Sequence, residues 1–426
     1  MSRCIAVDLT RLFLGPLTRT PRGIDRADLG FARHFFERSE GEALGILPMP
    51  WGIRWYSRER SVRLVDFVEQ FWGERKELEA DAAYAWLKEQ LLTGASSIRL
   101  PTAHNGATQL LVAILQLIRQ AGFTFGRSIR TLPKGAVYLN TGQIALAVPM
   151  FLTWLRSRPD VIPVFMLHDV IPVENPEFAA KFTRSGHRRM LQNTVRYAKG
   201  LIVTTEAAGT SIARELARLG SQAIPTITVA PPVPAPFLAD CPKDAELGEL
   251  PYFVICGAIE PRKNHLLLLR LWRQLVDRHG RSAPKLVIVG LRWRTSDEVI
   301  ELLDNCRSIK GSVVEVAGLS TPGLRQLLAD ARALLMPSLA EGFGLPIVEA
   351  LALGTPVIAS DLPAHREAGG PYATYLAPDD ESQWTAAIEA LLTPQSFRAA
   401  KEHLRTYQPR TAAEYFAAIE HFIHSL

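Results

Sequence analysis

The chain has 426 residues, of which 47% are hydrophobic and 21% are charged. At roughly 150 residues per domain, this length predicts two or three domains, and two large ones are the simplest expectation. The high apolar fraction and the lack of low-complexity tracts exclude a largely disordered chain. We therefore expect a globular protein throughout.

The N-terminal run "MSRCIAVDLTRLFLG" is interrupted by Asp8 and Arg11 and has no small-residue cleavage site, so we expect no signal peptide. No apolar stretch reaches about 18 residues, which argues against a membrane-spanning helix. The four cysteines are scattered and form no Cys-x-x-Cys pair, which argues against a zinc site and a disulfide framework. A cytoplasmic location fits these features.

The formal net charge is +5 and the isoelectric point is about 9.0. Much of the excess lies in the first half, in clusters such as residues 19–26 and 184–190. Such clusters suit nucleic acid, an anionic membrane surface or phosphorylated substrates. They equally suit an ordinary solvated basic surface.

Short apolar runs alternate with longer amphipathic stretches, which is typical of βαβ units and parallel sheets. In the first half, the predicted strands are residues 4–9, 136–141, 162–169, 200–205 and 226–231. The predicted helices are residues 23–38, 105–121, 143–157, 177–198 and 206–219.

A proline-rich segment over residues 230–250 then breaks the pattern and predicts a linker. Beyond it, the predicted strands are residues 252–258, 285–291, 313–318, 333–338 and 356–360. The predicted helices are residues 264–278, 296–308, 321–332, 346–353, 381–393 and 411–425. The fold class is thus α/β with two doubly wound domains over residues 1–235 and 236–410, and we expect the helix within 411–426 to pack back on the first domain.

Neither domain has Gly-x-Gly-x-x-Gly after its first strand, and the chain has no Gly-x-x-x-x-Gly-Lys-Ser/Thr. The usual dinucleotide and P-loop signatures are therefore missing, and any phosphate must be held in another way.

A short helix is predicted in "EGFGLPIVEALALG". Pro346 suits its first position and Gly354 its left-handed end. Every face of this helix except that of Glu349 is apolar, which predicts burial. Because an unpaired buried carboxylate costs several kcal/mol, Glu349 needs donors or a place at the edge of a cleft. It can form a salt bridge to a residue such as Arg262, cap the helix, or accept both hydroxyls of a ribose.

The loop before this helix has the features of an anion site. Gly342 and Gly344 permit a tight turn and a close approach of a ligand to the backbone. The N–H groups of Phe343, Gly344 and Leu345 point out of the helix start, where an anion binds. Glu341 lies on the loop side of this site and can reach hydroxyls attached to the anion, although an exposed loop acid can also be inert.

A second segment, "GAIEPRKNH" over residues 257–265, follows the first strand of the second domain and opens a helix. Ligands of open α/β sheets bind at such a place. Arg262 and Lys263 supply the cations that a diphosphate requires, unless they are a solvated pair.

Together these segments resemble the retaining GT-B glycosyltransferases of the glycosyltransferase family 4 group. The resemblance rests on "EGFGLPIVE" with its Glu-x7-Glu spacing, on "EPRKN", and on the segments "VAGLSTPGLRQLLADARALLMPS" and "GTPVIASDLPAHREAGG" on either side. It covers residues 250–380 specifically and the first domain loosely, through "LHD", "LNTG" and "PRGIDRADL". It implies the GT-B fold, in which two Rossmann-like domains face each other across a cleft.

The resemblance implies that the second domain binds a nucleotide sugar. Arg262 and Lys263 would hold the diphosphate, Glu341 would contact the sugar hydroxyls, and Glu349 would bind the ribose. The loop at Gly318 and Leu319 would lie near the base. The implied donor-binding residues are Gly23, Gly257, Arg262, Lys263, Gly318, Leu319, Glu341, Gly342, Phe343, Gly344, Leu345 and Glu349.

In the first domain, His168 ends an apolar strand and, by the resemblance, lies close to the reacting sugar. Gly23 resembles the glycine of a loop that approaches the donor phosphates, although the family often has Gly-Gly where this chain has Arg22-Gly23. The implied catalytic residues are His168, Glu341, Arg262 and Lys263. The implied acceptor-binding residues are Arg22, Asn140, Thr141, Gly142 and Asp169.

The family retains the anomeric configuration and uses neither a metal nor another cofactor, and this sequence has no Asp-x-Asp motif. GDP-mannose is the first expectation for the donor, with UDP-sugars as the alternative. The basic clusters, together with aromatic residues expected to be exposed in segments 33–38 and 70–77, suit a lipid-linked saccharide acceptor at an anionic membrane. We therefore expect a role in bacterial polysaccharide or lipopolysaccharide assembly, on the inner face of the cytoplasmic membrane.

Other readings stay open. The chain can be a GT-B sugar-nucleotide epimerase or phosphorylase, although no lysine signals the pyridoxal phosphate of a phosphorylase. It can also be a non-catalytic scaffold or regulatory subunit, although the intact Glu341, Glu349, Arg262 and Lys263 argue against that. Nucleic-acid binding is not expected, because no recognised module accompanies the basic clusters.

Overall fold

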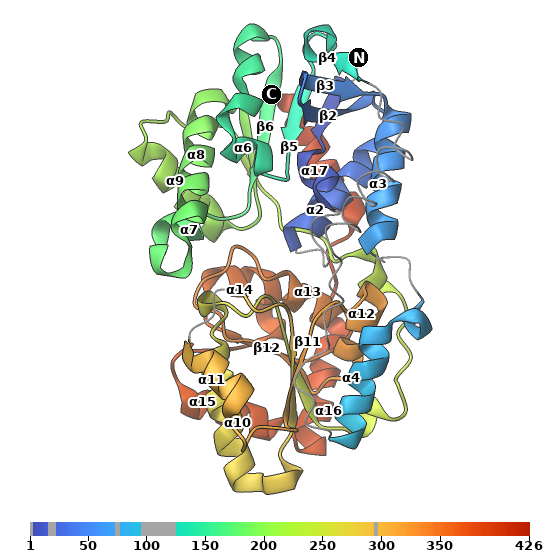
Figure 1. Cartoon of the computed structure of the whole chain (residues 1–426), viewed down its shortest axis with the longest axis vertical. Coiled ribbons are helices and arrows are strands. Elements are labelled where there is room, and N and C mark those ends of the chain that lie inside the picture. Colours follow the sequence, from blue (N-terminus) through green and yellow to red (C-terminus); the bar gives the residue numbers. More distant parts are fainter. Residues whose placement is uncertain (1–2, 16–22, 73–76, 95–124, 294–296) are drawn as a thin grey trace. The chain divides into compact units, whose positions relative to one another are not determined.

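The computed structural model describes residues 3–15, 23–72, 77–94, 125–293 and 297–426, and the chain forms two compact units (Figure 1). The first unit comprises Met1–Arg75, His104–Pro231 and Ala412–Leu426. The second comprises Lys76–Ala103 and Pro232–Thr411. The predicted helix over residues 105–121 and the predicted site residue Arg22 lie outside the described residues.

The first unit is built on one sheet with the strand order β4-β3-β2-β1-β5-β6-β7-β8. Its strands pair in parallel except for β3 and β4, which add an antiparallel edge. The strands are β1 (Ile5–Asp8), β2 (Ala43–Met49), β3 (Gly52–Tyr56), β4 (Arg127–Ser128), β5 (Val137–Asn140), β6 (Ile162–Leu167), β7 (Gly200–Val203) and β8 (Thr226–Thr228).

Helices cover both faces of this sheet, because successive strand residues point to opposite sides and both sets are apolar. Val7 and Met166 face a core with α2, α3 and α17, whereas Ala6 and Phe165 face a core with α6, α8 and α9. The helices of the unit are α1 (Thr10–Phe13), α2 (Gly23–Arg33), α3 (Arg58–Trp72), α6 (Ile144–Ala147), α7 (Ile171–Glu174), α8 (Lys181–Tyr197), α9 (Glu206–Arg218) and α17 (Ala412–Ser425).

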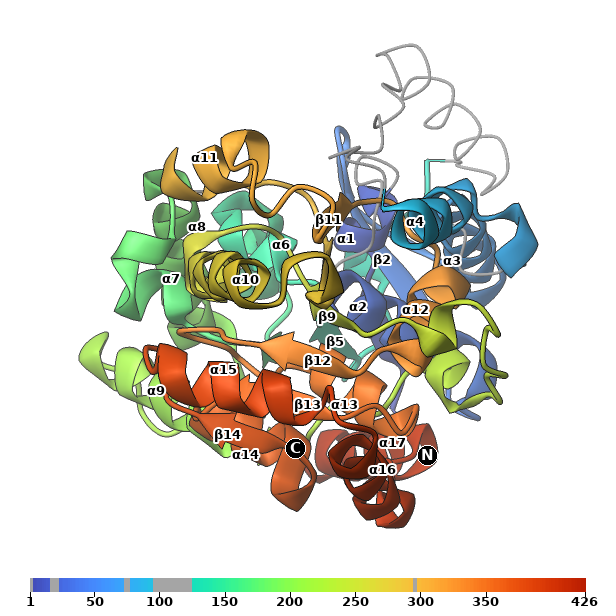
Figure 2. The same ribbon diagram turned by 90° about the horizontal axis from the view of Figure 1, so that it is seen from below.

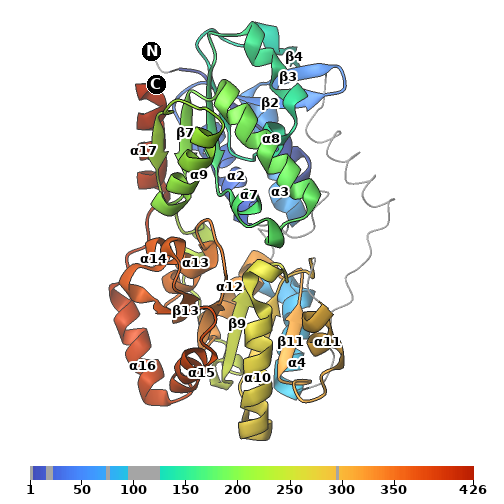
Figure 3. The ribbon, with the colours of Figure 1, turned by 90° about the vertical axis from the view of Figure 1, so that its left-hand side faces the viewer.

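The C-terminal helix α17 lies in the first unit, next to β7 (Figure 3). The rings of Tyr415 and Phe416 meet Phe31 of α2 edge-on, at centroid distances of 5.8 and 5.4 Å. His34 Nε2 lies 2.8 Å from Glu420 Oε1. These contacts place the end of the chain in the core of its first domain.

The second unit has a six-stranded sheet with the order β11-β10-β9-β12-β13-β14, and every pair is parallel. Numbered within the unit this order is 3-2-1-4-5-6, the order of Rossmann folds. The strands are β9 (Tyr252–Cys256), β10 (Lys285–Val289), β11 (Val313–Val316), β12 (Ala333–Met336), β13 (Val357–Ser360) and β14 (Thr374–Leu376).

On one face of this sheet, α10 and α15 lie side by side and share a core with α11 (Figure 2). Trp272 and Trp384 are fully buried in it. The helices of the unit are α4 (Ala82–Thr93), α10 (His265–His279), α11 (Asp297–Asn305), α12 (Thr321–Asp330), α13 (Leu345–Ala352), α14 (Pro363–Gly369), α15 (Glu381–Ala390) and α16 (Pro394–His403).

Each predicted strand overlaps a strand of the structure. The predicted helix over residues 143–157 is wrong as one element, since the chain forms α6 and the short 3-10 turns Pro149–Phe151 and Thr153–Ser157 instead. Pro149 explains the break, because it has no N–H to continue the helix. The unpredicted strands and α-helices are β2, β3, β4, β14, α1, α3, α4, α7, α14 and α16.

The predicted domain boundary also differs from the observed one. The chain enters the second unit at Pro232, and the proline-rich segment packs there, with Phe237 and Leu247 buried. Residues 76–103, predicted in the first domain, belong to the second unit. The reason is α4, which packs against β11 and α12 and whose Lys88 Nζ lies 2.7 Å from Asp244 Oδ2.

The expectation of exposed aromatic residues in segments 33–38 and 70–77 is wrong. Phe35 and Phe36 are buried, and so is Trp72, because they fill the core under α2, α3 and α17. Phe71 is half-buried against the same core. Within the described residues, no helix combines the length and apolarity that crossing a membrane would require.

Candidate functional site

The strand order of the second sheet reverses between β9 and β12, and two of the predicted motifs follow these strands. Residues 257–265 connect β9 to α10, and residues 337–344 connect β12 to α13. The crevice at the carboxyl ends of two such strands is where open α/β sheets bind ligands. The structure therefore brings the two segments to one edge of the sheet.

The segment after β9 is a tight loop. Gly257 has φ +139°, and a β-carbon there would lie 3.0 Å from Lys263 Cε. A β-carbon at Gly290, which follows β10, would lie only 1.9 Å from the carbonyl oxygen of Gly257. Glycine is required at position 290 because the two loops touch through their backbones. Gly290 was not among the predicted site residues. The feature of the sequence that could have indicated it is its position at the end of a predicted strand.

The segment after β12 forms the predicted elbow. Gly344 has φ +101° and precedes α13, and Gly354 has φ +65° just beyond the end of that helix. The predicted helix over residues 346–353 is confirmed to within one residue at each end. At the start of α13, Pro346 has no N–H and the Ile347 amide donates to the Gly344 carbonyl at 2.9 Å, so Leu345 supplies the helix-start amide that an anion can meet.

An ion cluster joins the two segments. Glu341 Oε2 lies 2.8 Å from Arg262 Nη1, and Glu341 Oε1 accepts from Lys263 Nζ and, at 2.9 Å, from Ser338 Oγ. Arg262 Nε also lies 2.7 Å from Glu260 Oε1. The backbones are linked as well, since Leu339 N donates to the Arg262 carbonyl at 2.7 Å. The cations that were expected to meet a diphosphate thus pair with a carboxylate in this structure.

Glu341 is not the exposed loop acid that remained one option, because its side chain is only 8% exposed. Burial alone would raise its pKa, but the charges of Arg262 and Lys263 outweigh that effect and hold the pKa well below its usual range. Glu341 is therefore ionised, and the positive charge available to a ligand depends on how this carboxylate is placed.

Sequence reasoning missed His365 of α14, which lies behind the elbow. Its Nδ1 donates to the Ser360 carbonyl at 2.9 Å, and its Cδ2 would lie 3.2 Å from a β-carbon at Gly344. Nε2 is buried, with no hydrogen-bond partner in the described part of the chain. Burial lowers the pKa of His365 more than Glu341 raises it, so the ring is neutral. A lone histidine in an amphipathic segment gave no signal of this contact.

Three further predicted donor residues, Glu349, Gly318 and Leu319, also belong to this unit. Glu349 lies in α13 and is 2% exposed, so its predicted burial is confirmed. Gly318, with φ +82°, and the buried Leu319 follow β11 at the same edge of the sheet. A backbone hydrogen bond holds the start of this loop next to the loop after β10, since Gly290 N donates to the Val316 carbonyl at 2.9 Å.

In the first unit, the strand order reverses between β1 and β5, and the predicted acceptor residues follow β5 and β6. His168 Nε2 lies 3.3 Å from the Thr141 carbonyl oxygen, and Asn140 Oδ1 accepts from Gln143 N at 3.0 Å. Gln143 was not predicted, yet its φ of +65° is rare for a non-glycine residue and marks a constrained turn. Asp169 Oδ1 accepts from Ile171 N at 3.1 Å, at the start of α7.

Buried acids that the sequence did not single out surround this turn. Arg11 Nη1 lies 2.8 Å from Asp25 Oδ1, and its Nε donates to the Gly142 carbonyl at 2.5 Å. Asp28 Oδ1 accepts from Thr141 Oγ1. Burial raises the pKa of Asp28 to about 7 and lowers the pKa of His168 to about 4. Gly23, another predicted donor residue, begins α2, the helix that carries Asp25 and Asp28.

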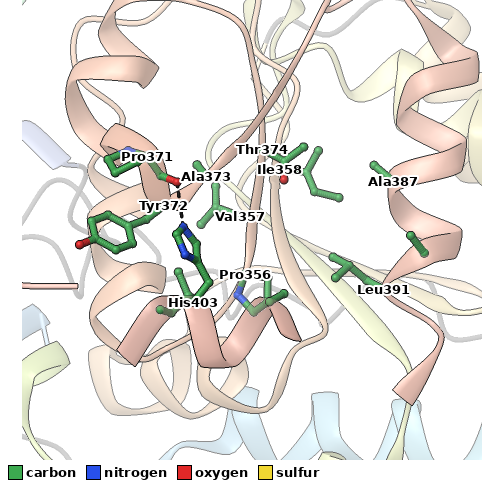
Figure 4. Close-up of a pocket in the computed structure, with 13 residues that line it drawn as sticks. Pro356, Val357, Ile358, Pro371, Tyr372, Ala373, Thr374, Ala387, Leu391 and His403 are labelled. Carbon is green, nitrogen blue, oxygen red and sulfur yellow. Dashed lines mark hydrogen bonds between the residues drawn. The ribbon is translucent and has the colours of Figure 1, made fainter. Parts of the chain in front are cut away.

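A pocket of about 360 Å³ lies elsewhere in the second unit (Figure 4). It is lined by the starts of β13 and β14, by Tyr372, and by α15 and α16, and His403 Nε2 donates to the Pro371 carbonyl at its rim, at 3.0 Å. Strand starts lie at the edge of the sheet opposite to the ion cluster, so we assign this pocket no part in the chemistry.

Residues 250–394 match the family model described as "Glycosyl transferases group 1". The match spans the loop after β9, the loop after β11, the ion cluster and the elbow. The second unit belongs to the group 1 glycosyltransferases. With the first unit included, the chain has two α/β units with largely parallel sheets, which is the GT-B architecture.

Sequence relatives of the chain include mannosyltransferases named as serotype-specific or O-antigen enzymes. The serotype-specific mannosyltransferase WbdA of Escherichia coli is 27% identical over 278 residues, which cover 61% of this chain and 33% of WbdA. The O-antigen chain mannosyltransferase RfbU of Salmonella typhimurium is 34% identical over 138 residues, 32% of this chain and 37% of RfbU. The chain thus spans about a third of the length of these relatives.

Solved structures share the fold over the whole chain. HepE of Anabaena in complex with UDP and glucose has a TM-score of 0.64 at 16% identity, with both chains covered completely. Sucrose-phosphate synthase of Thermosynechococcus elongatus has a TM-score of 0.57 at 16% identity, covering 99% of this chain and 98% of its own. At this identity the likeness shows the fold alone.

Proposed function

We propose that the chain is a retaining hexosyltransferase that moves a sugar from a nucleoside-diphosphate sugar to a hydroxyl group of a saccharide acceptor. The observation that carries this proposal is the cluster of Arg262, Lys263 and Glu341 beside the start of α13. Cations and helix-start amides at one edge of a sheet suit a diphosphate, and a carboxylate among them suits sugar hydroxyls.

The diphosphate of the donor takes over the hydrogen bonds that Arg262 and Lys263 now make with Glu341. A lysine ammonium has three N–H donors and a guanidinium has five, so both can bind phosphate and keep contact with the carboxylate. Glu341, once partly released, accepts from hydroxyl groups of the sugar. Glu349 binds the ribose diol and the loop at Gly318 and Leu319 contacts the base, as the family resemblance implies.

The acceptor binds at the turn after β5 in the first unit. His168, Asn140, Thr141 and Gly142 line this turn, and His168 is the group placed to position the reacting hydroxyl. Because its ring is neutral, it can accept a hydrogen bond from a hydroxyl group and add no charge. Asp169, whose side chain accepts from Ile171 N at the start of α7, is also proposed to contact the acceptor.

In the reaction, the bond between the anomeric carbon and the phosphate oxygen breaks, and the acceptor oxygen bonds to the same face of that carbon. The acceptor proton passes to the departing phosphate oxygen. Arg262, Lys263 and the amides of α13 stabilise the negative charge that develops on the diphosphate. No enzymic nucleophile is required, and no metal or other cofactor enters the proposal.

Mannose is the proposed sugar, from GDP-mannose, because WbdA and RfbU carry the name of mannosyltransferases. UDP-sugars are the alternative, since the HepE structure holds UDP and glucose. The name of RfbU supports an acceptor of the O-antigen type. We propose that a lipid carries this acceptor at the inner face of the cytoplasmic membrane.

A lipid-linked acceptor also implies contact with an anionic membrane, and α8 supports that part of the proposal. Its first turn exposes Lys181 and 80% of Phe182, and Arg188 and Arg189 are exposed further along. Met150, just after α6, which packs against α8, is 70% exposed. Exposed apolar side chains among cations suit the surface of an anionic bilayer. Asp substituted for Phe182 should abolish binding to phosphatidylglycerol vesicles and leave soluble acceptors unaffected.

The experiment that tests the function is an incubation of the purified protein with GDP-mannose, GDP-glucose, UDP-glucose and UDP-galactose, with and without a mannose-terminated acceptor. We expect transfer from one donor, with a product of the same anomeric configuration as the donor by NMR. Binding of a donor without transfer would favour a non-catalytic subunit. Failure to bind every donor would refute the proposal.

A further inference from the structure

Helix α4 is part of the second unit, although its sequence precedes most of the first unit. It packs against α12 and β11 (Figures 1 and 3). Near its middle, Lys88 Nζ lies 2.7 Å from both Asp244 Oδ2 and Glu246 Oε2. The helix is therefore fastened to the second unit along its length.

At the start of α4, the carboxylate of Asp81 connects two helices. Its Oδ1 accepts from the amides of Ala83 and Tyr84 at 3.0 and 3.1 Å, which caps α4. Its Oδ2 accepts from Ser320 N at 2.8 Å and from Ser320 Oγ at 2.6 Å. Ser320 Oγ in turn accepts from Gly323 N at 3.1 Å, which caps α12.

This contact is buried and closely fitted. Asp81 is 5% exposed and Ser320 is 7% exposed. A β-carbon at Gly323 would lie 2.3 Å from Asp81 Oδ2, so a larger residue there would push the carboxylate away. Glycine in the first turn of α12 is thus explained by the approach of Asp81.

Ser320 is also the last residue of the loop that follows β11. This loop contains Gly318, with φ +82°, and the buried Leu319, the residues that we propose to contact the base. Gly290 N holds the start of the loop through the Val316 carbonyl. Asp81 holds its end, through both the amide and the hydroxyl group of Ser320.

We infer that Asp81 is a positioning residue for nucleotide recognition, because from α4 it fixes the loop of residues 317–320 against the base. This inference rests on the proposed function, which supplies the base as the ligand of that loop. The two halves of the donor site then have different roles. The loop after β11 serves the base, whereas the ion cluster and the start of α13 serve the diphosphate.

The test compares two probes on Asp81→Asn. Asparagine is also a good helix cap, so it can keep an oxygen for the amides of α4, but it replaces Oδ2 by a donor that faces the two donors of Ser320. We expect Asp81→Asn to weaken binding of the preferred nucleoside diphosphate by about fivefold or more, as the loss of hydrogen bonds predicts, and to change pyrophosphate binding by less than about twofold. Titration calorimetry measures both.

The control is Thr393→Ala, which removes the cap of α16, where Thr393 Oγ1 accepts from Ser396 N at 3.4 Å. It should leave both affinities as in the wild type. If Asp81→Asn does not fold, as judged by circular dichroism, Ser320→Ala takes its place with the same expectation. Unchanged nucleotide affinity, or equal losses for both probes, would overturn the inference alone. A wild-type protein that binds no nucleoside diphosphate would overturn the proposed function and this inference together.

Discussion

Arg262 Nη1 and Glu341 Oε2 lie 2.8 Å apart, although they belong to loops that follow different strands of the second sheet. The pair is only partly exposed, at 26% and 8% of the two side chains. Parallel strands bring their carboxyl ends to one edge, so residues distant in sequence meet there. The cations of the proposed donor site therefore pair with the acid that is proposed to bind the sugar.

Glu341→Gln should separate nucleotide binding from transfer. Without the carboxylate, Arg262 and Lys263 lose a competitor for the diphosphate, so nucleoside diphosphate affinity should rise by about threefold or more. The transfer rate should fall by about 100-fold or more, because the sugar hydroxyls lose a charged acceptor and face an amide instead. Calorimetry and a transfer assay on the same preparation check both. Weaker binding of the diphosphate would show that the carboxylate helps to hold it.

The elbow before α13 can be tested with a matched pair of glycines. Gly344 and Gly354 both have positive φ, but only at Gly344 would a β-carbon meet other atoms, with Ile347 Cδ1 at 3.1 Å and His365 Cδ2 at 3.2 Å. In both alanine variants the free energy of unfolding should fall by about 1 kcal/mol, because alanine does not readily adopt the positive φ of these positions. Only Gly344→Ala should also lose nucleoside diphosphate binding. Equal affinities for the two variants would argue against an anion site at the elbow.

Glu349→Gln tests the proposed ribose contact. Nucleoside diphosphate affinity should fall by about tenfold, since a charged acceptor of two hydroxyls becomes a neutral one. A 2′,3′-dideoxynucleoside diphosphate should bind both proteins equally, because it lacks those hydroxyls. Collapse of the fold, seen by circular dichroism, would instead favour a structural role for the buried carboxylate.

The buried acid Asp28 predicts a pH effect on stability. Its pKa is raised to about 7 in the folded chain, by burial above all, against about 3.9 in an unfolded chain. Between these values the folded state holds a proton that the unfolded state has lost, so this contribution to stability is complete below pH 4 and is lost as the pH rises to 7. The stability advantage of the wild type over Asp28→Asn should fall by roughly 1.4 kcal/mol for each pH unit in that window.

Urea denaturation of the two proteins at pH 5 and pH 8 measures this difference. His168 changes stability in the opposite sense, since its pKa is lowered to about 4 and its contribution is lost as the pH falls from about 6.5. It is present in both proteins and largely cancels in the comparison. A difference between the two proteins that does not depend on pH would show that Asp28 is ionised in the folded chain.

The sequence predicted those parts of the structure that depend on local pattern. The strands followed from apolar runs, and α13 from Pro346 and Gly354 at its ends. The sequence did not reveal that Glu341 pairs with Arg262 and Lys263, because a contact across 78 positions depends on the order of the strands in the sheet.

The placement of α4 was missed for a related reason. Its residues follow those of the first domain without a break in composition. Contacts distant in sequence assign the helix to the second unit, among them those of Asp81 with Ser320 and of Lys88 with Asp244. The exposed aromatics of segments 33–38 and 70–77 were wrongly predicted because a cluster of arginine and glutamate around an aromatic pair resembles a surface. The amphipathic turn nevertheless directs Phe35 and Phe36 into the core.

The central claim, that the edge formed by Arg262, Lys263 and Glu341 binds the donor diphosphate, is tested most directly by titrating nucleoside diphosphates into Lys263→Met and Lys285→Met. Lys285 is a half-buried lysine of the same unit, but it begins β10, at the opposite edge of the sheet. The account predicts that Lys263→Met lowers the affinity by about 10-fold to 100-fold and that Lys285→Met binds like the wild type. Equal affinities for the wild type and Lys263→Met would contradict it.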